Sequence, residues 1–293
     1  MNSNLCPLCH RGDALGKPWI HSISGYEFQT CFGLNRPEHS GQRHYFRVDT
    51  GEPITVRDGT HLSLIGLLER GRPYEAELRG FPGDFLFHKC GVSVLTTVDI
   101  AEVMPDNHGL WSWARGIEQA GLVITMLAIQ RGADHVGAQL RGFHRRGGSA
   151  QPLPDLIRTL GSAEGIYTPS FTRILPSAIV AHEGAWGAIA ATWDAEEYQS
   201  QEIFSVAALS ASTRPETIQS TLGLIFPGVP RFSVFDQDPA GIKLRERTLE
   251  IAKPITISGA GQGKDYRDLI PGLRFERLSE IVRAELKLLG GHQ

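Results

Sequence analysis

Short apolar runs alternate with segments of helical periodicity along the last third of the chain. Four such runs follow residue 174, and they are SAIVAHE (177–183), EIFSVAALS (202–210), RFSVFDQD (231–238) and KPITIS (253–258). Pro215 and Pro239 stand where helices between the runs are expected to begin. Proline costs nothing at that position, because its missing N–H would be unbonded there in any case. The pattern predicts repeated β–α units and a parallel sheet flanked by helices.

The first two thirds of the chain show weaker patterns. WIHSISGYEFQT (19–30) alternates loosely around a Ser-Gly turn and predicts a small β module. FLFHKCGVSVLTTV (85–98) is rich in strand formers, and LWSWARGIEQAGLVITMLAIQRG (110–132) predicts a helix that passes into a strand. From these changes along the chain we expect three units, at residues 1–50, 51–172 and 173–293.

Composition narrows the class of protein. The 293 residues are 41% hydrophobic and 21% charged, which is typical of a folded soluble chain. The longest apolar stretches fall short of the roughly 20 residues that span a bilayer, and MNSNLCPLCHRGD lacks the pattern of a signal peptide. We therefore expect a cytoplasmic protein without a membrane partner.

The net charge gives no general attraction to nucleic acid. It is −3 at pH 7, so any contact with DNA or RNA must depend on a local basic patch. One candidate patch lies in a glycine-rich segment, QLRGFHRRGG, and consists of Arg141, His144, Arg145 and Arg146. These side chains either bind phosphate or form a solvated basic turn, and the cluster by itself favours neither interpretation.

The chain contains four cysteines, too few for a disulfide framework at this length. Cys6 and Cys9 form a C-x₂-C pair that matches one half of a tetrahedral zinc site, and Cys31 could begin the second half. Cys90 lies within an apolar, strand-like run, so we expect it to be a small buried side chain.

Acidic residues stand at the ends of two predicted strands. Glu183 follows one apolar run, and Asp236 and Asp238 follow another. The carboxyl edge of a parallel sheet is where ligands bind, and carboxylate oxygens are the hard ligands that Mg²⁺ prefers. Such a metal would engage phosphate. The alternative is local: Glu183 is a solvated loop residue, and the aspartates cap a helix.

Three segments of this region resemble the successive motifs of a Toprim domain, in both order and spacing. They are VAHEG (180–184), VFDQDPAG (234–241) and GKDYRDLI (263–270). The last is similar to the ending of primase-like Toprim proteins of phages and plasmids. The resemblance covers roughly residues 174–273 and implies that one glutamate and a DxD pair bind divalent metal. One departure is Gly187, where many primase-like members have an acidic residue.

The N-terminal cysteines and the basic segment resemble further parts of a DnaG-type primase. In that family a CPxH or CPxC knuckle and a short sheet precede a second knuckle similar to YxCFGC. Here Leu34 occupies the final cysteine position of the second knuckle, so His39 is our expected fourth zinc ligand. Its rivals are His21, His44 and Cys90. Primases also place a basic, glycine-rich segment before the Toprim domain, as VGAQLRGFHRRGG does here.

The resemblance implies a DNA primase that joins ribonucleotides on a single-stranded DNA template. It implies an α/β fold with a zinc-ribbon-like β module (1–50), an α+β part of the primase core (51–172) and a Toprim catalytic domain (173–293). Asp236 and Asp238 are expected to hold Mg²⁺ or Mn²⁺, and Glu183 to assist metal binding or proton transfer. Zn²⁺ is the second expected metal. The expected substrate-binding residues are Arg141, Arg145, Arg146, Lys264 and Asp265.

Two other functions stay open. A Toprim nuclease would use the same acids to activate water, and a non-catalytic DNA-binding or regulatory protein could retain the fold. Gly187 and Leu34 are the best support for the non-catalytic function. The expected partners are single-stranded DNA and nucleoside triphosphates. Because the chain has no GxxxxGK[ST] motif, a replicative helicase would be a separate partner.

Overall fold

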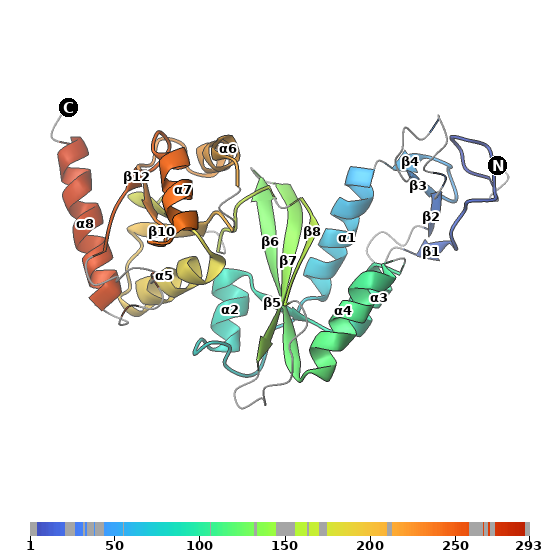
Figure 1. Cartoon of the computed structure of the whole chain (residues 1–293), viewed down its shortest axis with the longest axis horizontal. Coiled ribbons are helices and arrows are strands. Elements are labelled where there is room, and N and C mark those ends of the chain that lie inside the picture. Colours follow the sequence, from blue (N-terminus) through green and yellow to red (C-terminus); the bar gives the residue numbers. More distant parts are fainter. Residues whose placement is uncertain are drawn as a thin grey trace. The chain divides into compact units, whose positions relative to one another are not determined.

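The apolar runs of the last third form a parallel sheet in the computed structural model of the chain (Figure 1). The strands lie in the order β10-β9-β11-β12, and each neighbouring pair is parallel. Their bounds are β9 (Ala178–His182), β10 (Ile203–Ala207), β11 (Arg231–Val234) and β12 (Lys253–Pro254). The prediction of a parallel sheet built from repeated β–α units is confirmed.

Helices cover both faces of this sheet. They are α5 (Ala185–Glu197), α6 (Pro215–Ile225), α7 (Pro239–Thr248) and α8 (Leu273–Gly290). Ile179 and Ala181 of β9 share a buried cluster with side chains of α6 and α7. The alternate residues Ala178 and Val180 share another with side chains of α5 and α8. Burial on both faces explains why β9 is apolar along most of its length.

The described part of the chain forms two units, each with its own internal contacts. The structure describes residues 5–20, 27–31, 33, 38, 44–54, 56–105, 107–131, 134–144, 156–162, 164–169, 175–209, 213–257, 266, 269 and 273–290. Unit 1 comprises Met1–Arg72, Val94–Met126 and Leu140–Gly161; unit 2 comprises Pro73–Ser93, Leu127–Gln139 and Ser162–Gln293. The division expected at residues 50 and 172 stays a prediction. Among the described helices, none is long and apolar enough to cross a bilayer.

Unit 1 begins with a small antiparallel sheet in the order β1-β2-β3-β4. Its strands are β1 (Trp19–Ile20), β2 (Glu27–Cys31), β3 (His44–Arg47) and β4 (Pro53–Ile54). Among the described residues, the core beside this sheet includes Cys6, Cys31 and Phe46 as buried members.

Among the described residues, the middle of the chain contributes a third sheet and four helices. The sheet has the order β5-β6-β7-β8. Its strands are β5 (Ser93–Leu95), β6 (Leu122–Arg131), β7 (Asp134–His144) and β8 (Ile157–Gly161). The helices are α1 (Val56–Arg70), α2 (Gly83–Cys90), α3 (Thr97–Val103) and α4 (His108–Gln119). The predicted passage from helix to strand over residues 110–132 is confirmed by α4 and β6.

One prediction for this region is wrong, because FLFHKC (85–90) belongs to helix α2 and not to a strand. Gly91 follows the helix in the left-handed conformation, with φ of 62°, and its N–H bonds the carbonyl of Leu86. That geometry ends a helix, and glycine adopts it without strain. Cys90 is buried as expected, but at the end of a helix.

Candidate active site and metal centre

The three acidic residues of the predicted site follow adjacent strands at one edge of the sheet. β9 and β11 are parallel neighbours, and His182 pairs with Val234. Glu183 follows His182 directly, and Asp236 lies two residues beyond Val234. The acids therefore stand at the carboxyl edge, where parallel sheets bind ligands.

Gly241, on the first turn of α7, lies beside the carboxylates of Glu183 and Asp238 and the backbone of Asp236. A Cβ atom at Gly241 would lie 2.8 Å from Oε2 of Glu183 and 2.2 Å from the carbonyl oxygen of Asp236. The backbone N–H of Gly241 donates to Oδ1 of Asp238 at 2.8 Å. Because its neighbours approach so closely, a side chain here would force the backbone of Asp236 to move.

Asp238 caps the N-terminus of α7, as the alternative interpretation of this aspartate predicts. Capping uses Oδ1, and a carboxylate has a second oxygen with which to bind a cation. Glu183, Asp236 and Asp238 are all partly exposed as residues, although Oε2 of Glu183 is itself buried. Oxygen donors of this kind are the ligands that Mg²⁺ and Mn²⁺ prefer. These residues offer the type of donor that a divalent cation takes, but their carboxylates are not grouped as metal ligands; among the described residues that grouping is found for Cys6, Cys9 and Cys31.

Gly187, where primase-like Toprim proteins often have an acid, packs directly against His182. A Cβ atom at Gly187 would lie 3.1 Å from Nδ1 and 3.3 Å from Cβ of His182. His182 is 1% exposed, and burial, with a smaller contribution from the charge of Arg274, lowers its pKa to about 3. A neutral imidazole therefore occupies the space that a side chain at position 187 would enter.

Tyr266, from the GKDYRDLI motif, is buried beside the same histidine. Its ring centre lies 5.2 Å from that of His182, at an interplanar angle of 73°. Lys264 and Asp265, which we expect to bind substrate, lie outside the described residues. Tyr266 has one distinguishing signal in the sequence, which is that it is an aromatic residue within a polar motif.

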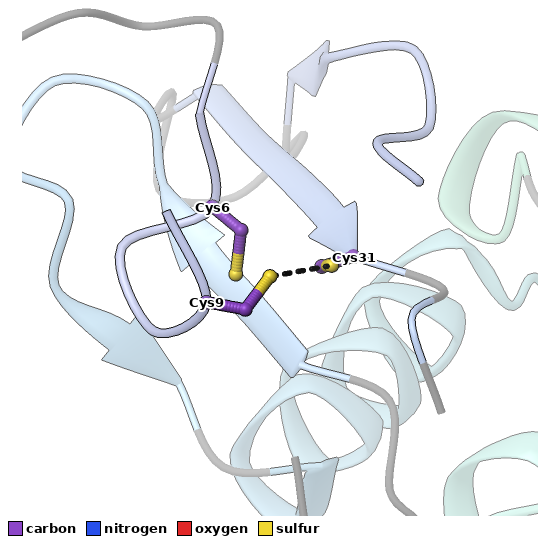
Figure 2. Close-up of side chains that lie close together, drawn as sticks. All are labelled: Cys6, Cys9 and Cys31. Atoms are coloured by element: carbon purple, nitrogen blue, oxygen red, sulfur yellow. Dashed lines mark hydrogen bonds between the residues drawn. The ribbon is translucent and has the colours of Figure 1, made fainter. Parts of the chain in front are cut away.

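Cys6, Cys9 and Cys31 converge in unit 1 (Figure 2). Their sulfur atoms all lie within 4.8 Å of one another, and those of Cys9 and Cys31 are 4.0 Å apart. A tetrahedral zinc ion with Zn–S bonds of about 2.3 Å holds two sulfurs about 3.8 Å apart. Burial raises the pKa of Cys31 to about 12, and the neighbouring Cys6 and Cys9 act in the same direction. Zn²⁺ would favour the thiolates instead, and the three donors are consistent with zinc.

Among the candidates for the fourth zinc ligand, Cys90 is the one whose side chain the structure describes. It is buried in unit 2, where its carbonyl oxygen accepts a hydrogen bond from the hydroxyl of Tyr167 at 2.5 Å. The cysteine cluster found among the described residues does not include it. The structure does not describe the side chains of the remaining candidates, which are His21, His39 and His44. It does not describe Leu34 either. His39 stays a prediction.

Arg141 is the member of the basic patch whose side chain the structure describes. It lies on β7, where its carbonyl oxygen accepts a hydrogen bond from the hydroxyl of Thr125 at 3.0 Å. Its guanidinium carbon is 5.3 Å from the ring centre of Phe143. Arg145 and Arg146 lie outside the described residues. Phosphate binding by this patch stays a prediction.

Known proteins resemble the chain in structure. No family model matches it, and no curated protein matches its sequence. The primase fragment of the bacteriophage T7 primase-helicase protein is 14% identical over 58% of this chain and 70% of that chain, with a TM-score of 0.36. A second match comes from a structure of the bacteriophage T7 lagging-strand DNA polymerase interacting with primase domains of two gp4 subunits, which are bound to an RNA/DNA hybrid and dTTP. The matching chain is 14% identical over 57% of this chain and 84% of that chain, with a TM-score of 0.37. The zinc-binding and RNA polymerase domains of the Aquifex aeolicus primase are 13% identical over 79% of this chain and 62% of that chain, with a TM-score of 0.48.

Proposed function

We propose that this protein is a DNA primase, which synthesises short RNA primers on single-stranded DNA by metal-dependent nucleotidyl transfer. The observation that supports the proposal is the position of Glu183 and Asp238 beside Gly241, next to the backbone of Asp236, at the carboxyl edge of the parallel sheet. The three cysteine sulfurs of unit 1 support it, because they supply most of the ligands of a zinc module like the one that the sequence resembles.

In the proposed reaction, the 3′-hydroxyl of one nucleotide attacks the α-phosphorus of an incoming nucleoside triphosphate. The new O–P bond replaces the bond to pyrophosphate, which leaves, and the hydroxyl proton passes to Glu183 or to water. Asp236 and Asp238 would hold Mg²⁺ or Mn²⁺, which would supply positive charge to the reacting phosphate. Glu183 would assist metal binding.

Substrate binding is assigned to the basic patch and to the GKDYRDLI motif. A guanidinium group suits phosphate because its planar fork makes two parallel hydrogen bonds to the oxygens. The residues concerned are Arg141, Arg145, Arg146, Lys264 and Asp265. The partners are a single-stranded DNA template and nucleoside triphosphates, with any replicative helicase as a separate protein.

Primer synthesis by the purified chain tests the proposal. The protein is incubated with single-stranded DNA of mixed sequence, labelled ribonucleoside triphosphates and either Mg²⁺ or Mn²⁺, and the products are separated by size on a denaturing gel. We expect short labelled RNA that requires both template and metal. Cleavage of the template without RNA synthesis would indicate a nuclease. Binding of DNA with neither reaction would indicate a non-catalytic protein.

A further inference from the structure

Arg79 stands at a backbone position that arginine rarely occupies. Leu78 and Phe81 exchange both backbone hydrogen bonds across a two-residue turn, each at 3.0 Å. The residues within the turn, Arg79 and Gly80, have φ values of 54° and 84°. Positive φ at both positions defines a turn in which asparagine, aspartate or glycine is the usual first residue. A strained residue of this kind persists where the surrounding structure holds it, and such residues gather at ligand sites.

The loop that carries this turn is firmly packed within unit 2. The carbonyl oxygen of Tyr74 approaches Gly83 so closely that a Cβ atom there would lie 1.5 Å from it. Leu78 is 1% exposed. Phe81 lies between aromatic rings, 6.3 Å from Trp186 and 5.8 Å from Trp193. Packing of Leu78 and Phe81 therefore holds the turn in place, while the side chain of Arg79 is exposed.

The guanidinium of Arg79 lies over the indole of Trp186, with its carbon 5.0 Å from the ring centre. Trp186 is 4% exposed and belongs to the first turn of α5, three residues after Glu183. Stacking on an aromatic face orients a guanidinium. An oriented cation thus lies against the first turn of the helix that follows the glutamate of the acidic edge.

We propose that Arg79 binds a phosphate group at the acidic edge, and this assignment rests on the proposed primase function. Three carboxylates repel phosphate, so a ligand that approaches them needs positive charge in addition to the bound metal. A planar, oriented guanidinium can supply it through two parallel hydrogen bonds. The phosphate belongs either to a nucleoside triphosphate or to the backbone of a nucleic-acid strand, because the two present the same oxygens.

Binding measurements on the full chain separate the two phosphate sources. ATP without template, and a single-stranded oligonucleotide without nucleotide, are each titrated in Mn²⁺ at several salt concentrations. Asn suits the positive φ of the turn, so Arg79→Asn removes the charge and should melt at or above the temperature of the parent. We expect about tenfold weaker binding of one probe, in line with the loss of a charge-assisted hydrogen bond. If that probe is the oligonucleotide, the slope of log K against log salt should fall by about 0.7.

Two further variants make the result specific. Arg79→Lys keeps the charge but loses the planar fork, and it should bind the affected probe with an affinity between those of the parent and Arg79→Asn. Arg115→Asn removes an exposed arginine from α4 and should leave both affinities within about twofold of the parent. Parent-like binding of both probes by Arg79→Asn overturns the assignment even where the parent makes primers. A parent that binds neither probe and makes no primers removes the proposed function and this inference together.

Discussion

The carboxylate of Asp194 receives two hydrogen bonds from the guanidinium of Arg274, one from Nε at 2.6 Å and one from Nη2 at 2.9 Å. The pair joins α5 to α8, and the two side chains are only 3% and 5% exposed. The hydroxyl of Tyr266 donates to the same carboxylate at 2.9 Å. The ring of Tyr266 also packs edge-on against His182, the residue that precedes Glu183.

Asp194→Asn should lower the free energy of unfolding by about 3–5 kcal/mol, because it leaves the buried charge of Arg274 without its counterion. Urea denaturation gives this value. Glu202→Gln is the matched control: it removes a carboxylate that pairs with Arg283 at the surface, where the partners are 49% and 57% exposed. The control should cost less than about 1 kcal/mol. Equal effects of the two substitutions would show that the network adds no stability beyond that of a surface pair.

Asp236→Asn and Asp238→Asn should each abolish primer synthesis, because each removes a negative charge needed to hold the metal. Glu183→Gln should do likewise. Asparagine caps helices about as well as aspartate, so Asp238→Asn should keep the stability of the parent, and Asp238→Ala should lose about 1 kcal/mol. Glu246→Gln removes an exposed carboxylate from α7 and serves as the control. Normal synthesis by Asp236→Asn would contradict the assignment of the acids.

Gly241→Ala should lower both stability and activity, since its Cβ atom would lie 2.2 Å from the backbone oxygen of Asp236. The expected loss is about 1–3 kcal/mol, as for other overpacked positions. Gly223→Ala is the control, because the nearest atom to a Cβ atom there is a side-chain nitrogen of Arg231 at 3.7 Å. That substitution lies within helix α6 and should stabilise it by about 0.5–1 kcal/mol. A parent-like Gly241→Ala protein would show that the backbone of Asp236 does not pack against Gly241 as described.

The purified protein should contain about one zinc per chain, which elemental analysis measures. Cys6→Ser and Cys31→Ser should lose the metal, whereas Cys90→Ala, which changes a buried cysteine of the other unit, should keep it. Zinc displaces thiol protons, and burial raises the pKa of Cys31 to about 12. Zinc affinity should therefore rise between pH 6 and pH 8, by about tenfold per pH unit for each proton displaced. A flat profile in chelator competition would exclude thiolate ligation.

Replacing Arg145 and Arg146 together with alanine should weaken binding of single-stranded DNA and reduce its dependence on salt, because fewer counterions are then released. Fluorescence titrations at several salt concentrations measure both quantities. Arg115→Ala serves as the control, because it removes an exposed arginine elsewhere in the chain. Arg283→Ala is less suitable, since Arg283 forms an ion pair with Glu202. If the double variant and the parent give the same affinity and the same slope, the basic segment is a solvated turn.

The parallel sheet and its acidic edge could be predicted because several local signals agree there. Apolar runs of strand length end at acidic residues, and Pro215 and Pro239 mark the helix starts that follow. Parallel pairing then brings the strand ends to one edge, so the proximity of Glu183 and Asp236 follows from topology. The sequence also identified the three clustered cysteines.

The remaining features depend on contacts that no short segment encodes. FLFHKC is a short apolar run, and such a run fits a strand or a buried helix equally well. Packing of α2 against α5 and the left-handed Gly91 favour the helix. The turn at Arg79 was missed because its first position usually holds asparagine or glycine, so an arginine there gives no turn signal.

The contact between Gly187 and His182 links two positions that are five residues apart in the sequence. A Cβ atom at 187 would lie 3.1 Å from the imidazole nitrogen and 3.3 Å from the Cβ atom of His182, so His182 would have to shift by a few tenths of an ångström to admit a side chain. Because the ring of His182 packs against Tyr266, an acid at 187 would also disturb that contact. The side chain at 187 and the packing around His182 therefore cannot change independently.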